Sequence, residues 1–235
     1  MNANNQLEQR YRLLLHRIRQ AESSCGRKTG STKLLAVSKT RSAEEIRALA
    51  GLGQRRFGEN YLQESEEKIL QLRDLPIEWH FIGRIQSNKT RAIAQHFDWV
   101  HSVASLKHAR RLNEQRPPEM PPLNICLQVN TSGEASKDGH DPELLPEMLA
   151  DYASLPNLRV QGLMTIPAPA QSATEMRYPF QLLRNMRDRL ASTELPLETL
   201  SMGMSDDLEV AIAEGATLIR IGTAIFGPRA YNQST

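Results

Sequence analysis

Residues 34–40 read Leu-Leu-Ala-Val-Ser-Lys-Thr, an apolar run that stops on a lysine. A similar run, Asn-Ile-Cys-Leu-Gln-Val-Asn, lies at 124–130. Uninterrupted apolar character is typical of strands that are covered on both faces, as in a parallel sheet. The two runs therefore predict a parallel sheet with helices on its faces. The lysine at the end of the first run needs a separate explanation, because an ammonium ion is costly to keep beside a buried strand.

Short strand candidates alternate with helix candidates along the rest of the chain. The strand candidates are residues 34–38, 55–59, 78–83, 99–103, 124–130, 159–166, 198–202 and 218–222. The helix candidates between them are residues 42–51, 61–73, 87–97, 105–116, 141–154, 173–192 and 206–214. Such alternation indicates strand–helix–strand units. Eight successive units favour a single domain over residues 1–235 that forms a closed (β/α)8 TIM barrel, with an open doubly wound sheet as the alternative.

An extra helix is predicted before the first strand, over residues 5–25. Its apolar residues recur at helical spacing and share one face. They are Tyr11, Leu14, Leu15, Ile18 and Cys25. This face is predicted to be buried.

The overall composition excludes several classes of protein. The net charge is +2, so no global field favours nucleic acid or an anionic membrane as a partner. Cys25 and Cys126 form no CxxC pair, which argues against a disulfide scaffold or a metal site and fits a reducing compartment. The polar start of the chain lacks the apolar core of a signal peptide, and no apolar run approaches the roughly 20 residues that span a bilayer. We therefore expect a cytoplasmic protein.

The polar and small residues of the pattern gather at the carboxyl ends of the predicted strands, where barrels carry their chemistry. They are Lys39, Glu59, Asn60, His80, Asn130, Thr165, Ser201, Arg220, Gly222 and Thr223. The loops after the last two strands, 201–205 and 220–227, are rich in small residues and match the place where barrels commonly hold a phosphate. In the first loop, Gly203 is expected to let the backbone approach a ligand, and Ser205 is expected to cap the next helix.

Lys39 has two interpretations. An isolated lysine at a strand end usually extends its charged head into water. In a barrel mouth, however, partial burial lowers the pKa of the amine, and a neutral amine can attack an aldehyde to form a Schiff base. A ligand with an aldehyde, a phosphate and an aromatic nitrogen would use the lysine, the small-residue loops and the arginine together. Pyridoxal 5′-phosphate is such a ligand.

Seven motifs in order along the chain resemble those of the pyridoxal phosphate homeostasis proteins, the bacterial YggS group. They are Leu34-Leu-Ala-Val-Ser-Lys-Thr40, Phe57-Gly-Glu-Asn-Tyr61, Trp79-His-Phe-Ile-Gly83, Gln86-Ser-Asn-Lys89, Gly162-Leu-Met-Thr-Ile166, Leu200-Ser-Met-Gly-Met-Ser-Asp-Asp207 and Arg220-Ile-Gly-Thr-Ala-Ile-Phe-Gly227. The resemblance implies a barrel like the N-terminal domain of alanine racemase and a monomer. It also implies that the cofactor is a Schiff base on Lys39 and that Ser201, Gly222 and Thr223 hold its phosphate. Arg220 would face the pyridine nitrogen, and Asn60 and Met202 would line the ring.

Two functions remain open at this point. A guanidinium beside the pyridine nitrogen should keep that nitrogen unprotonated, which makes the ring a weak electron sink. A racemase also needs a second base, which in the resembled racemases comes from a separate domain; here Tyr231 is the remaining candidate. These points favour a non-catalytic protein of intracellular pyridoxal phosphate homeostasis, which buffers the cofactor and delivers it to apo-enzymes. The alternative is an amino-acid racemase, a decarboxylase or a Schiff-base aldolase.

Three further residues have no assigned role. His80 is expected to form part of the core or the pocket wall, with a catalytic role as the alternative, and Glu59 could orient Asn60 or pair with a lysine. Lys137 lies in the polar loop 131–140 and could close over the ligand or stay in solvent.

Overall fold

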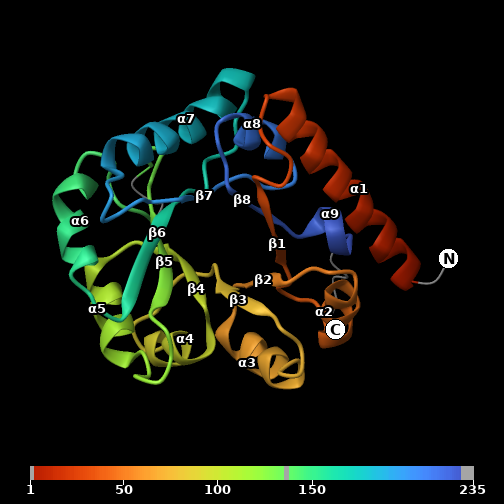
Figure 1. Cartoon of the computed structure of the whole chain (residues 1–235), viewed down its shortest axis with the longest axis horizontal. Helices are drawn as coiled ribbons and strands as arrows, with labels where there is room; N and C mark the ends of the chain where they lie inside the picture. The colour runs from red at the N-terminus through yellow and green to blue at the C-terminus, as the bar shows by residue number, and fades with distance from the viewer. Residues whose placement is uncertain (1–2, 135–137, 229–235) are drawn as a thin grey trace.

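The computed structural model describes residues 3–134 and 138–228, in which eight parallel strands form a closed ring inside a layer of helices (Figure 1). The strands are β1 (Lys33–Val37), β2 (Arg56–Glu59), β3 (Glu78–Phe81), β4 (Trp99–Val103), β5 (Leu123–Gln128), β6 (Leu158–Met164), β7 (Thr199–Ser201) and β8 (Leu218–Ile221). Lys137 and Tyr231 lie outside the described residues, so their expected roles stay predictions.

Helices follow the strands around the outside of the ring. They are α1 (Ala3–Ser24), α2 (Ala43–Gly51), α3 (Leu62–Gln71), α4 (Thr90–His96), α5 (Leu106–Gln115), α6 (Leu145–Ala153), α7 (Ala173–Leu190), α8 (Leu208–Ala213) and α9 (Thr223–Phe226). Within the described ranges, no helix is long and apolar enough to cross a membrane.

The ring closes because β1 pairs with strands on both of its sides. Ala36 lies opposite Phe57 of β2 and opposite Ile221 of β8. The remaining strands pair in sequence order. The predicted barrel is therefore confirmed, and the open doubly wound sheet is excluded because it would leave β1 and β8 unpaired with each other.

Several local predictions need correction. The strands and helices are mostly one to four residues shorter at an end than predicted, because the terminal residues of each candidate belong to connecting turns. The short helix α9 was not predicted. The N-cap position of α8 is Asp207, not Ser205, and the Asp207 Oδ1 accepts a hydrogen bond of 2.6 Å from the Met204 amide, which precedes the helix.

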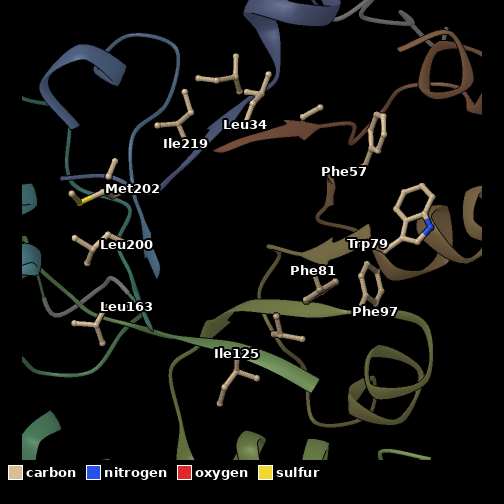
Figure 2. Packing of buried hydrophobic residues seen from close by; sticks show 14 of the residues in the cluster. Leu34, Phe57, Trp79, Phe81, Phe97, Ile125, Leu163, Leu200, Met202 and Ile219 are labelled. Atoms are coloured by element: carbon tan, nitrogen blue, oxygen red, sulfur yellow. The ribbon is translucent and has the colours of Figure 1, made fainter. Parts of the chain in front are cut away.

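The outer face of the strands supplies the main hydrophobic core. Successive side chains of a strand point to opposite faces, so every second residue meets the helices. Leu34, Phe57, Trp79, Ile125, Leu163, Leu200 and Ile219 all belong to one buried cluster. Figure 2 shows them projecting away from the ring of strands. Burying one such side chain contributes about 1.5–3 kcal/mol, and the cluster extends around the ring, so this layer holds the barrel closed.

Helix α1 packs along one side of the barrel against α8, α9 and α2 (Figure 1). Its buried apolar residues are Leu7, Tyr11, Leu14, Ile18 and Ala21, and Leu15 packs at the margin of the cluster. The predicted buried face is confirmed except at Cys25, which is exposed because the helix ends at Ser24.

Candidate functional site

The predicted site residues all lie at the carboxyl ends of the strands. Lys39 follows β1, Asn60 follows β2, Ser201 ends β7 and is followed by Met202, and Arg220 lies in β8 just before Gly222 and Thr223. Lys39, Gly222 and Thr223 line one small cavity of about 30 Å³, together with Val37 and Arg41. The structure thus brings the lysine of the first strand and the small-residue loop of the last strand to one place.

The backbone on both sides of Lys39 is held by a cluster of charged side chains, of which Glu59 and Lys68 are buried and Glu64 is half-buried. Lys68 Nζ of α3 donates to the Ser38 carbonyl at 2.8 Å, and the Ser38 hydroxyl donates to Glu59 Oε1 at 2.6 Å. On the other side, the Thr40 amide donates to Glu64 Oε1 at 2.6 Å. Lys68 also pairs with Glu59 at 2.9 Å and with Glu64. We call Glu59, Glu64 and Lys68 the lysine clamp.

Thr40 has a φ of +63°, in the left-handed region. A β-branched residue rarely adopts this conformation, which costs of order 1–3 kcal/mol and tends to occur at functional sites. The hydrogen bond from the Thr40 amide to Glu64 helps to offset that cost. The turn that contains Lys39 is therefore fixed by the clamp in a conformation that the local sequence alone would not choose.

Glu59 is fully buried, and burial raises the pKa of its carboxyl, although Lys68 and Ser38 act in the opposite direction. Its Oε2 has no hydrogen-bond partner among the described residues. Of the two roles expected for Glu59, the structure shows the pairing with a lysine: its Oε1 accepts hydrogen bonds from Ser38 and Lys68. Sequence reasoning missed Lys68, whose i, i+4 spacing from Glu64 is also that of an ordinary surface pair.

Arg220 is a fixed cation inside the rim. Its Nη1 donates to the Ser201 carbonyl at 2.6 Å and to the Ser201 hydroxyl at 2.8 Å, and its Nη2 donates to the Thr165 carbonyl at 2.8 Å. Burial lowers the pKa of the guanidinium to about 10, so it stays charged at neutral pH. Three hydrogen bonds, to the last residue of β7 and to the residue that follows β6, leave the guanidinium little freedom to reorient.

Asn60 offers an unused polar atom at the same rim. Its buried side-chain oxygen has no hydrogen-bond partner among the residues that the structure describes. The backbone carbonyl oxygen of Asn60 lies close to Gly83. A Cβ at position 83 would come within 2.1 Å of that oxygen, which explains the glycine of the Trp79–Gly83 motif. An amide oxygen buried without a partner is costly, and a ligand with a donor would satisfy it.

Ser201 was expected to hold the phosphate and Met202 to line the ring, but the side chains of both residues have other contacts. The Ser201 hydroxyl is fully buried and bonds both Arg220 and His101 Nδ1, the latter at 2.8 Å. The Met202 side chain belongs to the outer hydrophobic cluster beside Leu200 (Figure 2). A contact of Met202 with a bound ring would therefore use its backbone.

The glycines of the two loops are required for different reasons. Gly203 has a φ of +93°, and a Cβ there would lie 2.6 Å from the Ala211 Cβ of α8, so packing against that helix demands glycine. At Gly222 a Cβ would meet the Val37 carbonyl oxygen at 3.2 Å, beside the cavity that Lys39 lines. The loop after β8 is thus the closer match to a cradle around a small anion.

Two larger cavities of about 390 and 290 Å³ flank residues 167–170. Their lining includes Thr131, Tyr178 and Met204 but not Lys39. The small cavity that Lys39 lines shares no lining residue with the two larger cavities.

These residues fit pyridoxal 5′-phosphate. Lys39 lines a cavity together with the Gly222–Thr223 loop, the Asn60 side-chain oxygen has no hydrogen-bond partner within residues 3–134 and 138–228, and Arg220 is held as a cation at the same rim. An amine, an anion cradle, a cation and an acceptor match the aldehyde, phosphate, ring nitrogen and hydroxyl of that cofactor.

Comparison with known proteins gives three informative matches. The model of the alanine racemase N-terminal domain family matches residues 11–230. A pyridoxal phosphate homeostasis protein of Pseudomonas aeruginosa is 57% identical over 215 residues, which are 92% of this chain and 92% of that protein. The structure of PipY from Synechococcus elongatus with pyridoxal phosphate bound is 38% identical, with a TM-score of 0.77, and the match covers 89% of this chain and 100% of that chain.

An alanine racemase of Corynebacterium glutamicum shares the fold alone. It is 19% identical, with a TM-score of 0.67, and the match covers 92% of this chain and 61% of that chain. The barrel is thus similar to one part of a larger enzyme.

Proposed function

The chain belongs to the pyridoxal phosphate homeostasis protein family, and we propose that it holds pyridoxal 5′-phosphate reversibly through Lys39 without using it for catalysis. The observation that carries this proposal is the cavity that is lined by both Lys39 and the Gly222–Thr223 loop. When bound, the cofactor supplies an aldehyde carbon to which the lysine amine can form a covalent bond.

Each residue of the site then has a defined task. The lysine clamp orients the Lys39 turn through Ser38 and Thr40. Gly222 and Thr223 are assigned to the phosphate, and Ser201 can join them only through its backbone, because its hydroxyl bonds Arg220 and His101. The assignment places Asn60 and Met202 along the ring.

Arg220 supports storage over catalysis. A guanidinium donates hydrogen bonds and does not readily release a proton, so it stabilises an unprotonated ring nitrogen. An unprotonated pyridine withdraws electrons weakly, which disfavours carbanion chemistry on a bound amino acid. A cofactor that is held covalently by an amine, but not activated, can be displaced by another amine and released.

The first test is the absorbance spectrum of the purified protein after incubation with pyridoxal 5′-phosphate. We expect a visible band in the wild type and no band in Lys39→Ala. Lys33→Ala is the matched control, because Lys33 begins the same strand at the opposite rim and is exposed. Loss of the band in both variants, or its persistence in Lys39→Ala, would refute the assignment.

The second test separates storage from catalysis. The loaded protein is incubated with single L-amino acids, and chirality and carbon dioxide are followed. We expect rates no greater than those of free cofactor at the same concentration. Turnover above that level would instead support the racemase or decarboxylase.

The proposal includes the cellular setting. The protein would act in the cytoplasm as a single-domain monomer that buffers the cofactor and passes it to apo-enzymes, without nucleic acid or membrane as a partner. Both cysteines are free, which is compatible with a reducing compartment. Transfer can be followed as recovery of activity by an apo-enzyme mixed with the loaded protein.

A further inference from the structure

A row of hydrogen bonds crosses the interior of the barrel from Arg220 to Glu78. Arg220 Nη1 lies 2.8 Å from Ser201 Oγ, which lies 2.8 Å from His101 Nδ1. His101 Nε2 lies 2.8 Å from His80 Nδ1, and His80 Nε2 lies 2.8 Å from Glu78 Oε1. We call these five side chains the interior chain.

The interior chain crosses the ring at one step, between His101 and Ser201, and its other bonds lie within β3 or between neighbouring strands. His101 belongs to β4 and Ser201 to β7, and these strands are separated by β5 and β6 in the closed order. Glu78 begins β3, at the rim opposite the proposed cofactor site, where it pairs with Arg56 at 2.9 Å. The chain therefore links the two rims of the barrel.

The direction of every bond follows from its two ends. Arginine can only donate, so the Ser201 oxygen accepts from Arg220. At the other end, the bond from His80 lowers the pKa of the Glu78 carboxyl, and a carboxylate can only accept. His80 must then carry its proton on Nε2 and accept at Nδ1.

The same logic fixes the middle of the interior chain. Because His80 accepts at Nδ1, His101 must donate from Nε2 and accept at Nδ1. Ser201 must therefore donate its hydroxyl proton to His101. Burial lowers the pKa of both imidazoles, which agrees with one proton on each ring. All four bonds thus run the same way, from the cation to the carboxylate.

We propose that Glu78, His80 and His101 are positioning residues which, through Ser201, fix Arg220 against the cofactor ring and so tune the bound cofactor from the opposite rim. This inference rests on the proposed function. Hydrogen bonds in a row polarise one another inside a protein, so the Glu78 charge strengthens the bond that Ser201 makes to Arg220. Because Ser201 donates its hydroxyl proton to His101, that hydroxyl cannot donate to the phosphate of the cofactor. The Gly222–Thr223 loop would then donate the hydrogen bonds to the phosphate.

The direction of the bonds can be read without cofactor. Nitrogen-15 NMR of histidine-labelled protein reports which ring nitrogen carries the proton. We expect two imidazoles that are neutral and protonated at Nε2, assigned to His80 and His101 by their loss in His80→Gln and His101→Gln. A proton on Nδ1 of either ring, or a doubly protonated ring at neutral pH, would overturn the proposed direction.

The influence on the cofactor is tested at the far rim. Glu78→Leu removes the terminal acceptor, and we expect the visible band of the loaded protein to shift while the amount of bound cofactor stays the same. Arg56→Leu is the matched control, because it removes the other partner of Glu78 but leaves the interior chain intact. Glu78→Gln keeps an acceptor oxygen and should return the band toward the wild-type position.

The possible failures are distinguishable. Superimposable spectra for wild type and Glu78→Leu would overturn the tuning role and leave only a structural one. An equal shift in Arg56→Leu would also overturn it. If the wild type shows no band at all, the proposed function fails, and the NMR result still decides the direction of the interior chain.

Discussion

The two faces of the same strands have different composition and different tasks. On β8, Ile219 and Ile221 join the outer hydrophobic cluster, whereas Arg220 between them points its guanidinium to Ser201 and Thr165. On β3, Trp79 and Phe81 face helices, whereas His80 bonds His101. Period-two alternation thus separates a layer that stabilises the fold from an interior that carries polar chemistry.

Hydrogen bonds between the polar groups inside the barrel offset the cost of burying them. Arg220, His101, His80 and Ser201 are all buried, and each has hydrogen-bond partners. Cys126 is also fully buried, and burial raises the pKa of its thiol to about 12, so it stays protonated and unreactive. The comparison predicts that outer-face substitutions change mainly stability, and inner-face substitutions change mainly the cofactor.

The largest loss of stability is expected on the outer face. Phe57 is fully buried and packs against Trp79, with ring centroids 6.1 Å apart. Phe57→Ala should lower the free energy of unfolding by about 3–5 kcal/mol, since it removes a buried ring and leaves a cavity. Denaturant unfolding measures the loss. A loss of less than about 1 kcal/mol in the free energy of unfolding would contradict the different tasks of the two faces. A shift of the cofactor band while the protein is still folded would contradict them as well.

The lysine clamp should come next. Lys68→Met leaves the fully buried Glu59 without its cation, and breaking a buried ion pair costs about 3–5 kcal/mol. We expect about 3 kcal/mol, because Glu59 can take up a proton. The same variant should weaken cofactor binding, since Ser38 loses its contact with Lys68. Unchanged stability together with unchanged binding would show that the clamp does not hold the Lys39 turn.

A smaller stability effect is expected inside the ring. Ser201→Ala leaves Arg220 Nη1 and His101 Nδ1 without their shared partner, which should cost about 1–3 kcal/mol. The visible band should shift, and Ser201→Thr, which keeps the hydroxyl, should restore it. An unchanged band in Ser201→Ala would contradict the separation of the two faces.

The pH dependence of stability gives the smallest and most specific effect. The pKa of His101 is well below its ordinary value, chiefly through burial, so the unfolded chain binds a proton below about pH 6.5 that the folded protein does not. Its contribution to stability is therefore present above pH 6.5 and is lost as pH falls, by up to about 1.4 kcal/mol per pH unit.

Comparison with His101→Gln isolates this contribution, because His80 and His140 have lowered pKa values as well, and Glu59 and Asp98 have raised pKa values that act in the opposite direction. Urea unfolding at pH 7.5, 6.5 and 5.5 measures both proteins. Equal slopes would mean that His101 is not kept neutral by the fold.

The barrel could be predicted because alternation is a property of neighbouring residues, and parallel strands bring their carboxyl ends to one rim. That rule alone placed Lys39, Asn60 and Arg220 correctly at the rim. Helix α9 escaped prediction because its four residues, Thr223–Phe226, are too few to show a helical period.

The contacts that define the site could not be predicted in the same way. His101 meets Ser201, which lies 100 residues away, and only the closed ring brings them together. Lys68 and Glu64 have the spacing of a solvent-exposed pair, and the burial of Lys68 depends on how α3 packs beside β1 and β2. Such contacts depend on register and packing, which local periodicity does not encode.

Reductive trapping tests the central claim, the covalent bond between Lys39 and the cofactor, most directly. The protein is loaded with pyridoxal 5′-phosphate, treated with borohydride to make the bond permanent, digested and examined by mass spectrometry. We predict that the added mass falls on the peptide that contains Lys39, at close to one group per chain. Added mass on another lysine, such as Lys68, or no stable adduct, would contradict the account.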